Sequence, residues 1–144
     1  MLEIRELAIA GVFELIPRRF ADDRGWFTEN WNQQRFEDAG LTFDWCQDNH
    51  AYSEAAGVLR GLHFQKPPFA QTKLVRCLRG RIYDVAVDLR SGSPDYGKYV
   101  GLELSAEAGN QILVPQGFAH GYLTLEQACE VAYKVDAPYA RDHE

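Results

Sequence analysis

The sequence has few cysteines and no long hydrophobic stretch. Cysteine occurs only at positions 46, 77 and 129, an odd number without the paired spacing of a secreted disulfide framework. The N-terminus has no basic segment followed by an apolar one, and no apolar run is long enough to span a bilayer. We therefore expect a cytoplasmic protein that makes no membrane contact.

Positive charge is also scarce. The chain has 15 Lys and Arg against 21 Asp and Glu, which gives a formal net charge of −6. Broad binding to a nucleic-acid backbone needs Lys and Arg clustered on one face, so we expect no nucleic-acid partner. A pocket for a small anion depends on local charge, and five arginines are available for one: Arg24, Arg60, Arg76, Arg79 and Arg81.

Helical periodicity is rare, and the 144 residues fit a single domain. Short apolar or alternating runs bounded by turn residues predict six strands: Val58–Leu62, Lys73–Leu78, Ile82–Leu89, Tyr99–Leu104, Ile112–Val114 and Val131–Lys134. One surface helix is expected over Asn32–Ala39, with Asn30 or Asn32 as its N-cap and Gly40 after its end. This pattern indicates an all-β sandwich or barrel.

Two local features refine this picture. Arg79-Gly80 separates two predicted strands, and we expect a tight hairpin there with the strands paired antiparallel, because glycine supplies the positive φ of such turns. Along the second strand, Asp84 and Asp88 alternate with valines. One face should therefore meet the core, and the other should meet solvent or a cavity.

Two histidines lie beside turn residues at strand ends. His63 ends Gly-Leu-His, and His120 ends Pro-Gln-Gly-Phe-Ala-His, which fits the second half of the general cupin pattern. Metal-binding cupins carry another histidine two residues after the first, where this chain has Gln65, and they later carry a glutamate; Lys73 here would repel a cation. Two histidines fall short of the three or four protein ligands that a metal site needs. We therefore expect a cupin site without a metal, in which an imidazole is free to act as a base.

A more specific resemblance runs through almost the whole chain. The segments that carry it are Asp23–Glu29, Gln47–His50, Gly57–Gln65, Lys73–Arg76, Asp84–Asp88, Ser93-Pro94, Pro115–Gly121 and Tyr133-Lys134. In order and spacing they resemble the dTDP-4-dehydrorhamnose 3,5-epimerase family. The resemblance implies that residues 1–144 form one cupin jelly roll with one or two short surface helices, usually as a homodimer and without a cofactor or metal.

The resemblance also implies an activity and a set of site residues. The reaction is inversion of C3 and C5 of dTDP-4-dehydro-6-deoxy-D-glucose, which gives dTDP-4-dehydro-L-rhamnose. By matching positions, His63 is the general base, Tyr133 the general acid, and Lys73 the cation near the ketone oxygen. The positions expected to contact the nucleotide sugar are Arg24, Phe27, Glu29, Gln47, Asp48, Asn49, Arg60, His120 and Glu144.

The residue types suit this chemistry independently of the resemblance. A proton beside a ketone leaves only if the enolate is stabilised, and a lysine ammonium suits that oxyanion. Inversion also needs a base and a proton donor on opposite faces, roles that His63 and Tyr133 can fill. Taken singly, each residue has a plainer interpretation: Tyr133 as a strand tyrosine, Lys73 as an edge lysine and the histidines as structural groups.

The end of the sequence departs from the family pattern. Family members usually continue past Glu144 with a segment whose aspartate pairs with the catalytic histidine, so the domain is expected to lack that segment. Asp84 faces the right side of its strand to replace the aspartate. Three alternatives stay open: a single-centre epimerase or ketoisomerase of a related deoxysugar, a module that binds the nucleotide sugar with little turnover, and a metal cupin oxygenase.

Overall fold

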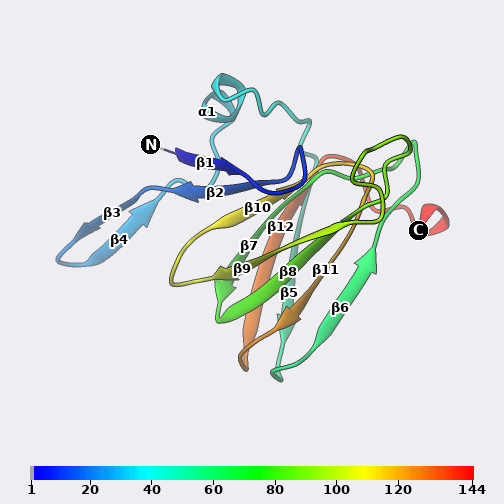
Figure 1. Cartoon of the computed structure of the whole chain (residues 1–144). Coiled ribbons are helices and arrows are strands. Elements are labelled where there is room, and N and C mark those ends of the chain that lie inside the picture. Colours follow the sequence, from blue (N-terminus) through cyan, green and yellow to red (C-terminus); the bar gives the residue numbers. More distant parts are fainter. Residues whose placement is uncertain (1) are drawn as a thin grey trace.

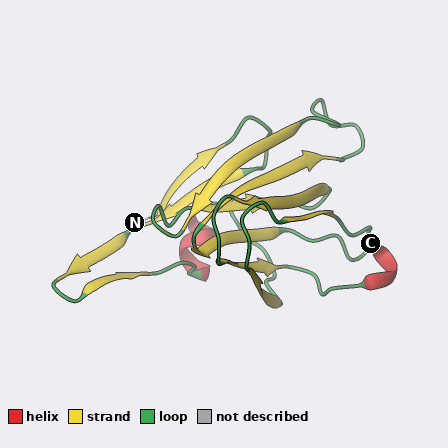
Figure 2. Cartoon of the chain, turned by 90° about the horizontal axis from the view of Figure 1, so that it is seen from below, coloured by secondary structure: helices red, strands yellow, loops and turns green. Residues whose placement is uncertain are grey.

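The computed structural model describes residues 2–144, about half of which form β-strands (Figures 1 and 2). Within this range the chain forms twelve strands, one α-helix and one short 3-10 helix. In order they are β1 (Leu2–Glu6), β2 (Phe13–Pro17), β3 (Arg19–Asp22), β4 (Gly25–Thr28), α1 (Gln33–Asp38), β5 (Gln47–Ser53), β6 (Leu59–His63), β7 (Lys73–Arg79), β8 (Arg81–Asp88), β9 (Tyr99–Ser105), β10 (Gln111–Val114), β11 (Phe118–Thr124), β12 (Cys129–Val135) and η1 (Arg141–His143).

Two antiparallel sheets form the body of the molecule. The larger has the strand order β1-β2-β10-β7-β12-β5, and the smaller has the order β6-β11-β8-β9. Apolar residues from both sheets meet in one core, including Val75 and Val131 from the larger sheet and Ile82 and Leu104 from the smaller. The predicted all-β jelly roll is confirmed.

The predicted helix is confirmed at α1. The Asn32 side chain is the N-cap and accepts a hydrogen bond from the Arg35 backbone N–H, and Gly40 has a φ of +78° just after the helix. Phe36 is buried in a cluster with Leu74 and Leu113, which lie on the outer face of the larger sheet. No helix in the part of the chain that the structure describes is long and apolar enough to cross a membrane.

All six predicted strands are present, and their ends shift by at most two residues. The expected pairing around Arg79-Gly80 is wrong. Strand β7 pairs with β10 and β12, whereas β8 pairs with β11 and β9, so the turn carries the chain from one sheet to the other. Gly80 has the expected positive φ of +81°. This conformation occurs in a turn between two sheets as well as in a hairpin, so the glycine alone did not distinguish them.

The alternation along β8 is confirmed, and the structure shows which face is buried. Asp84, Ala86 and Asp88 are buried, whereas Val85 and Val87 are half-buried on the opposite face. Asp88 is neutralised by Arg90, whose Nη2 lies 3.0 Å from Oδ2. The buried face therefore contains carboxylates, each with its own partner.

Strands β3 and β4 form a separate hairpin that projects from the body (Figures 1 and 2). Its aromatic side chains are largely open to solvent, with Trp26 58% and Phe27 68% exposed. Such apolar exposure on a projecting arm is typical of a surface that meets a partner.

Candidate active site

A cavity of about 400 Å³ lies between the two sheets. Strands β5, β7 and β12 supply one wall, and β6 and β11 supply the other. The residues that line it are Ala51, Leu59, Arg60, Gly61, His63, Lys73, His120, Gly121, Tyr122 and Tyr133. His63, Lys73 and Tyr133, which the resemblance assigns to catalysis, therefore line one cavity.

The two histidines lie on neighbouring strands. His63 is the last residue of β6 and is exposed, whereas His120 on β11 stands opposite it in register and is buried. The strands approach closely because of two glycines: a Cβ on Gly61 would lie 2.7 Å from the His120 carbonyl oxygen, and one on Gly121 would lie 2.6 Å from the Arg60 carbonyl oxygen. Any side chain at these positions would push His63 away from His120.

Asp84 pairs with His120. Its two carboxylate oxygens lie 2.9 and 2.8 Å from His120 Nε2, and both side chains are almost completely buried. Burial raises the pKa of the Asp84 carboxyl, and the nearby His120 and Lys73 oppose that rise. The expectation that Asp84 serves as the carboxylate partner of His63 is wrong in this structure, because the β8–β11 pairing directs it to the other histidine.

Lys73 and Tyr133 come from the adjacent strands β7 and β12. The Lys73 Nζ lies 6.0 Å from the centroid of the Tyr133 ring, and the lysine is only 9% exposed. Burial lowers the pKa of the Lys73 ammonium, while the carboxylates of Asp84 and Glu144 favour its charged form. Burial raises the pKa of the Tyr133 phenol, with Arg60 acting against the rise, so the phenol stays protonated at neutral pH.

Arg60 lines the cavity from β6, and Gln47 and Asn49 lie nearby on β5. Arg60 donates from Nε to Ser53 Oγ at 3.0 Å and from Nη2 to the Tyr52 carbonyl at 2.8 Å, which fixes its guanidinium beside the cavity. Gln47 Nε2 donates to Asn49 Oδ1 at 2.9 Å. Both residues occupy alternate, half-buried positions on β5 that face the same way as Ala51 in the cavity wall.

A smaller pocket of about 140 Å³ adjoins the cavity, because the two share His63, Lys73 and Tyr133. Tyr139 and Glu144 form its far side. Together the two pockets bring an imidazole, an ammonium and a phenol into one space open to solvent. This set can remove a proton from carbon, stabilise the resulting oxyanion and return a proton.

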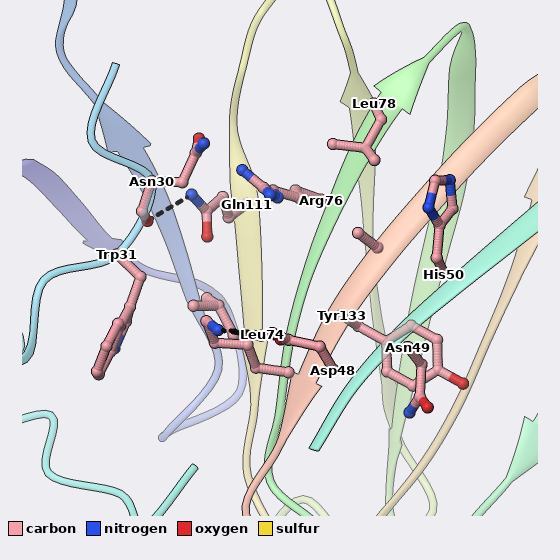
Figure 3. Close-up of a pocket in the computed structure, with 12 residues that line it drawn as sticks. Asn30, Trp31, Asp48, Asn49, His50, Leu74, Arg76, Leu78, Gln111 and Tyr133 are labelled. Atoms are coloured by element: carbon pink, nitrogen blue, oxygen red, sulfur yellow. Dashed lines mark hydrogen bonds and ion pairs between the residues drawn. The ribbon is translucent and has the colours of Figure 1, made fainter. Parts of the chain in front are cut away.

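A third pocket, of about 290 Å³, lies on the outer face of the larger sheet (Figure 3). It contains Arg76 beside Gln111, whose Nε2 donates to the Asn30 carbonyl at 2.9 Å. His50 is also there, and its Nε2 lies 3.3 Å from Glu130 Oε1. Within residues 2–144, no three His, Cys, Asp or Glu side chains come together in an arrangement that could hold a metal ion.

The family model described as dTDP-4-dehydrorhamnose 3,5-epimerase matches residues 6–144. The chain belongs to this family. An epimerase of the same description from Sinorhizobium fredii is 51% identical over 144 residues, an alignment that covers 97% of this chain and 72% of the relative.

Solved structures of family members agree with this fold. That of the Bacillus anthracis dTDP-4-dehydrorhamnose 3,5-epimerase, with TDP and PPi bound, matches with a TM-score of 0.97 at 49% identity, and the match covers 99% of this chain and 82% of that one. That of a dTDP-6-deoxy-D-glucose-3,5-epimerase from Legionella pneumophila, in complex with dTDP-4-keto-L-rhamnose, gives a TM-score of 0.94 at 39% identity, with 99% and 76% covered.

Four residues that the epimerase resemblance assigns to the substrate lie away from the cavity. Arg24 sits at the turn of the β3–β4 hairpin with its Nη2 2.6 Å from Asp22 Oδ2, and Phe27 is exposed on β4. Glu29 follows the hairpin and pairs with Arg35 on α1. Asp48 points to the outer face of the larger sheet, where it accepts from Lys134 Nζ at 3.0 Å.

Tyr139 is a pocket residue of this epimerase-family chain that the sequence analysis missed. It is 57% exposed, and its backbone N–H donates to Gln47 Oε1 at 3.2 Å. It lies in an irregular segment after β12, where no periodicity marks the direction of a side chain. The sequence signal was an aromatic residue directly after Pro138, in the segment that follows β12.

Proposed function

We propose that this chain is a dTDP-4-dehydrorhamnose 3,5-epimerase that inverts C3 and C5 of dTDP-4-dehydro-6-deoxy-D-glucose. One observation supports this most: His63, Lys73 and Tyr133 line the same cavity in a chain of this family. The substrate carries its ketone at C4, between the two carbons to be inverted. A single oxyanion site can therefore serve both steps.

In the proposed mechanism, His63 removes the proton from the carbon beside the ketone. The negative charge that develops on the C4 oxygen is stabilised by the Lys73 ammonium, which is desolvated and so interacts strongly with a nearby anion. Tyr133 then delivers a proton to the opposite face. Its raised pKa suits it to this role because the hydroxyl keeps its proton until the carbanion takes it.

The Asp84–His120 pair contributes a buried carboxylate near Lys73 in the proposed site. It lies on the wall that carries His63, and the Asp84 carboxylate acts on the Lys73 ammonium. We propose that it supports the charged form of Lys73 while His120 contacts the sugar. Gln47, Asn49, Arg60 and Glu144 extend the same binding surface toward the nucleotide.

We propose that the enzyme acts as a homodimer in which the β3–β4 hairpin reaches the site of the partner subunit. Arg24 and Phe27, assigned to the substrate by resemblance, sit on a hairpin that projects away from the two sheets of their own chain (Figure 1). The exposed aromatic side chains of that arm would be covered by such an exchange.

Mixing two inactive variants tests this arrangement. A His63→Ala chain keeps its hairpin, and an Arg24→Ala/Phe27→Ala chain keeps its base, so a mixed dimer has one complete site only if the hairpins are exchanged. We expect activity to return on mixing and re-equilibration. A mixture as inactive as its components, in samples shown by sedimentation to be mixed dimers, would exclude the exchange.

We also propose a cytoplasmic location, because all three cysteines are free thiols and two of them are buried. Cell fractionation with an antibody to the chain tests this placement. Recovery from a secreted or periplasmic fraction would exclude it.

Product analysis by NMR in heavy water tests the reaction itself. With dTDP-4-dehydro-6-deoxy-D-glucose as substrate, we expect deuterium at both C3 and C5 and inversion of both centres. Inversion confined to one carbon would identify a single-centre epimerase, and a chain that binds the nucleotide sugar without any exchange would be a binding module. Either result would overturn the double epimerase.

A further inference from the structure

Two segments far apart in the sequence are joined at the open end of the cavity. One is the loop of residues 64–72, which connects His63 on β6 to Lys73 on β7; the other is residues 136–144 after β12, here called the strap. The Thr72 N–H donates to Asp136 Oδ1 at 2.6 Å, and the Lys66 N–H donates to the His143 carbonyl at 2.8 Å. The strap therefore runs along the loop rather than free in solvent.

Gln65 lies at the centre of this junction and is 7% exposed. Its Nε2 donates to the Phe69 carbonyl at 2.7 Å and to the Pro138 carbonyl at 3.2 Å, and its Oε1 accepts from the Ala140 N–H at 2.9 Å. One amide thus joins its own loop to two backbone groups of the strap. A carboxylate has no donors and an apolar side chain has neither donors nor acceptors, so neither could make all three bonds.

The strap carries residues that line the smaller pocket. Tyr139 lies between the two strap positions that Gln65 holds, and Glu144 faces the same pocket as His63 and Lys73. A second bond, from Gln71 Nε2 to the Ala137 carbonyl at 2.9 Å, fixes the start of the strap. Backbone bonds hold the two ends of the strap, and the side chains of Gln65 and Gln71 hold the residues between them.

We infer that Gln65 is a positioning residue that holds the strap as one wall of the substrate cavity. This inference rests on the proposed function, since it gives the wall the nucleotide sugar as its ligand. Gln65 stands two residues after His63, so the loop that follows the base carries the group that holds the strap on both sides of Tyr139. The amide acts on binding, through the strap, and does not touch the reacting carbons.

Gln65→Ala tests the inference, with Lys66→Ala as the matched control because Lys66 contributes only its backbone N–H to the junction. Hydrogen exchange should show faster exchange of the Ala140 amide in Gln65→Ala, while the amides of β7 and β12 keep their protection. KM should rise roughly tenfold, as expected for the loss of two neutral hydrogen bonds to the strap. The kcat should change far less, and Lys66→Ala should match the wild type.

The pH dependence of KM in Gln65→Glu gives a second test, which can be used if Gln65→Ala fails to fold. The carboxylate keeps an acceptor for the Ala140 N–H but loses both donors, so its KM should be raised at pH 8. Lowering the pH protonates the carboxyl group and restores a donor, so KM should move back toward the wild-type value. A packing defect alone would not make KM fall as the pH is lowered.

Binding of dTDP-glucose, which lacks the ketone and cannot react, separates this inference from the proposed function. If Gln65→Ala binds it roughly tenfold more weakly than the wild type does, the strap is a binding wall whatever the reaction is. Unchanged affinity of Gln65→Ala for dTDP-glucose would overturn the inference, whatever the Ala140 exchange rate. A wild-type chain that binds dTDP-glucose without epimerising the ketone substrate would overturn only the proposed reaction.

Discussion

Buried Asp84 and His120 should stabilise the fold through their mutual interaction. The variants Asp84→Asn and His120→Asn and the double variant together measure it. Asparagine keeps the size of the aspartate and one oxygen acceptor but removes the charge. Hydrogen bonds to charged groups contribute about 1.5–3 kcal/mol, and both partners here are almost completely buried at 2.8–2.9 Å. We therefore expect a coupling of about 1.5–3 kcal/mol in the free energy of unfolding, measured with urea at pH 7.

Activity should respond to the same change. The Asp84 carboxylate favours the charged form of Lys73, whose pKa burial already lowers. Without that carboxylate the pKa of Lys73 falls further, so the ammonium is lost at a lower pH. The alkaline limb of the kcat/KM profile should therefore move to lower pH in Asp84→Asn.

Two outcomes would refute this reasoning. Free energies of unfolding that add to within about 0.5 kcal/mol would show that the two side chains do not interact. An alkaline limb that stays in place would show that Asp84 does not support the charge on Lys73. Lys134→Met is the control, since it removes a partly exposed cation on the outer face and should leave the profile unchanged.

Four further predictions concern the chemistry and the fold. Lys73→Met should keep nucleotide binding but lower turnover roughly a hundredfold to a thousandfold, as for loss of one oxyanion-stabilising group; near-normal turnover would remove Lys73 from the mechanism. In heavy water, His63→Ala should abolish deuterium wash-in at both carbons, whereas Tyr133→Phe should exchange faster than it inverts; equal behaviour of the two would contradict their separate roles. Exhaustive chelation should leave the rate unchanged, and a loss restored by one divalent metal would contradict this. Asp88→Asn should destabilise the protein by about 2 kcal/mol at pH 7, because the pKa of Asp88 is lowered from 3.8 to about 2 by Arg90. Because the folded-state pKa lies below the unfolded value, the ionised Asp88 carboxylate stabilises the folded protein above pH 3.8, and this stabilisation is lost as the pH falls through about 2. The free energies of unfolding of wild type and variant, measured with urea, should therefore converge at about pH 2.

The strands that could be predicted are those whose apolar residues follow a period of two. Strands β7 and β8 were found because valine, leucine and isoleucine recur along them. Strand β5 was missed because its half-buried positions include the polar residues Gln47 and Asn49, and β11 was missed because Gly121 interrupts it next to His120. These two strands carry polar residues or a glycine where a regular apolar pattern would place apolar side chains.

The site was predicted only in part for a related reason. The resemblance correctly brought His63, Lys73 and Tyr133 together, although their roles remain predictions. The partner of Asp84 depends on which strand lies beside β8, and the turn at Gly80 gave the wrong answer to that question. Side chains that act across strand pairs need the strand order, which local sequence does not contain.

The strand order has a consequence for how a newly made chain folds. Strand β11 lies between β6 and β8, and β12 lies between β7 and β5. Until residues 118–135 have left the ribosome, four earlier strands each have an unpaired edge, which is the kind of surface that favours association with other chains. The pairings that close both sheets join residues far apart in the sequence, and such pairings form slowly. Insertion of β11 and β12 therefore covers those edges and also adds His120 and Tyr133 to the walls of the cavity.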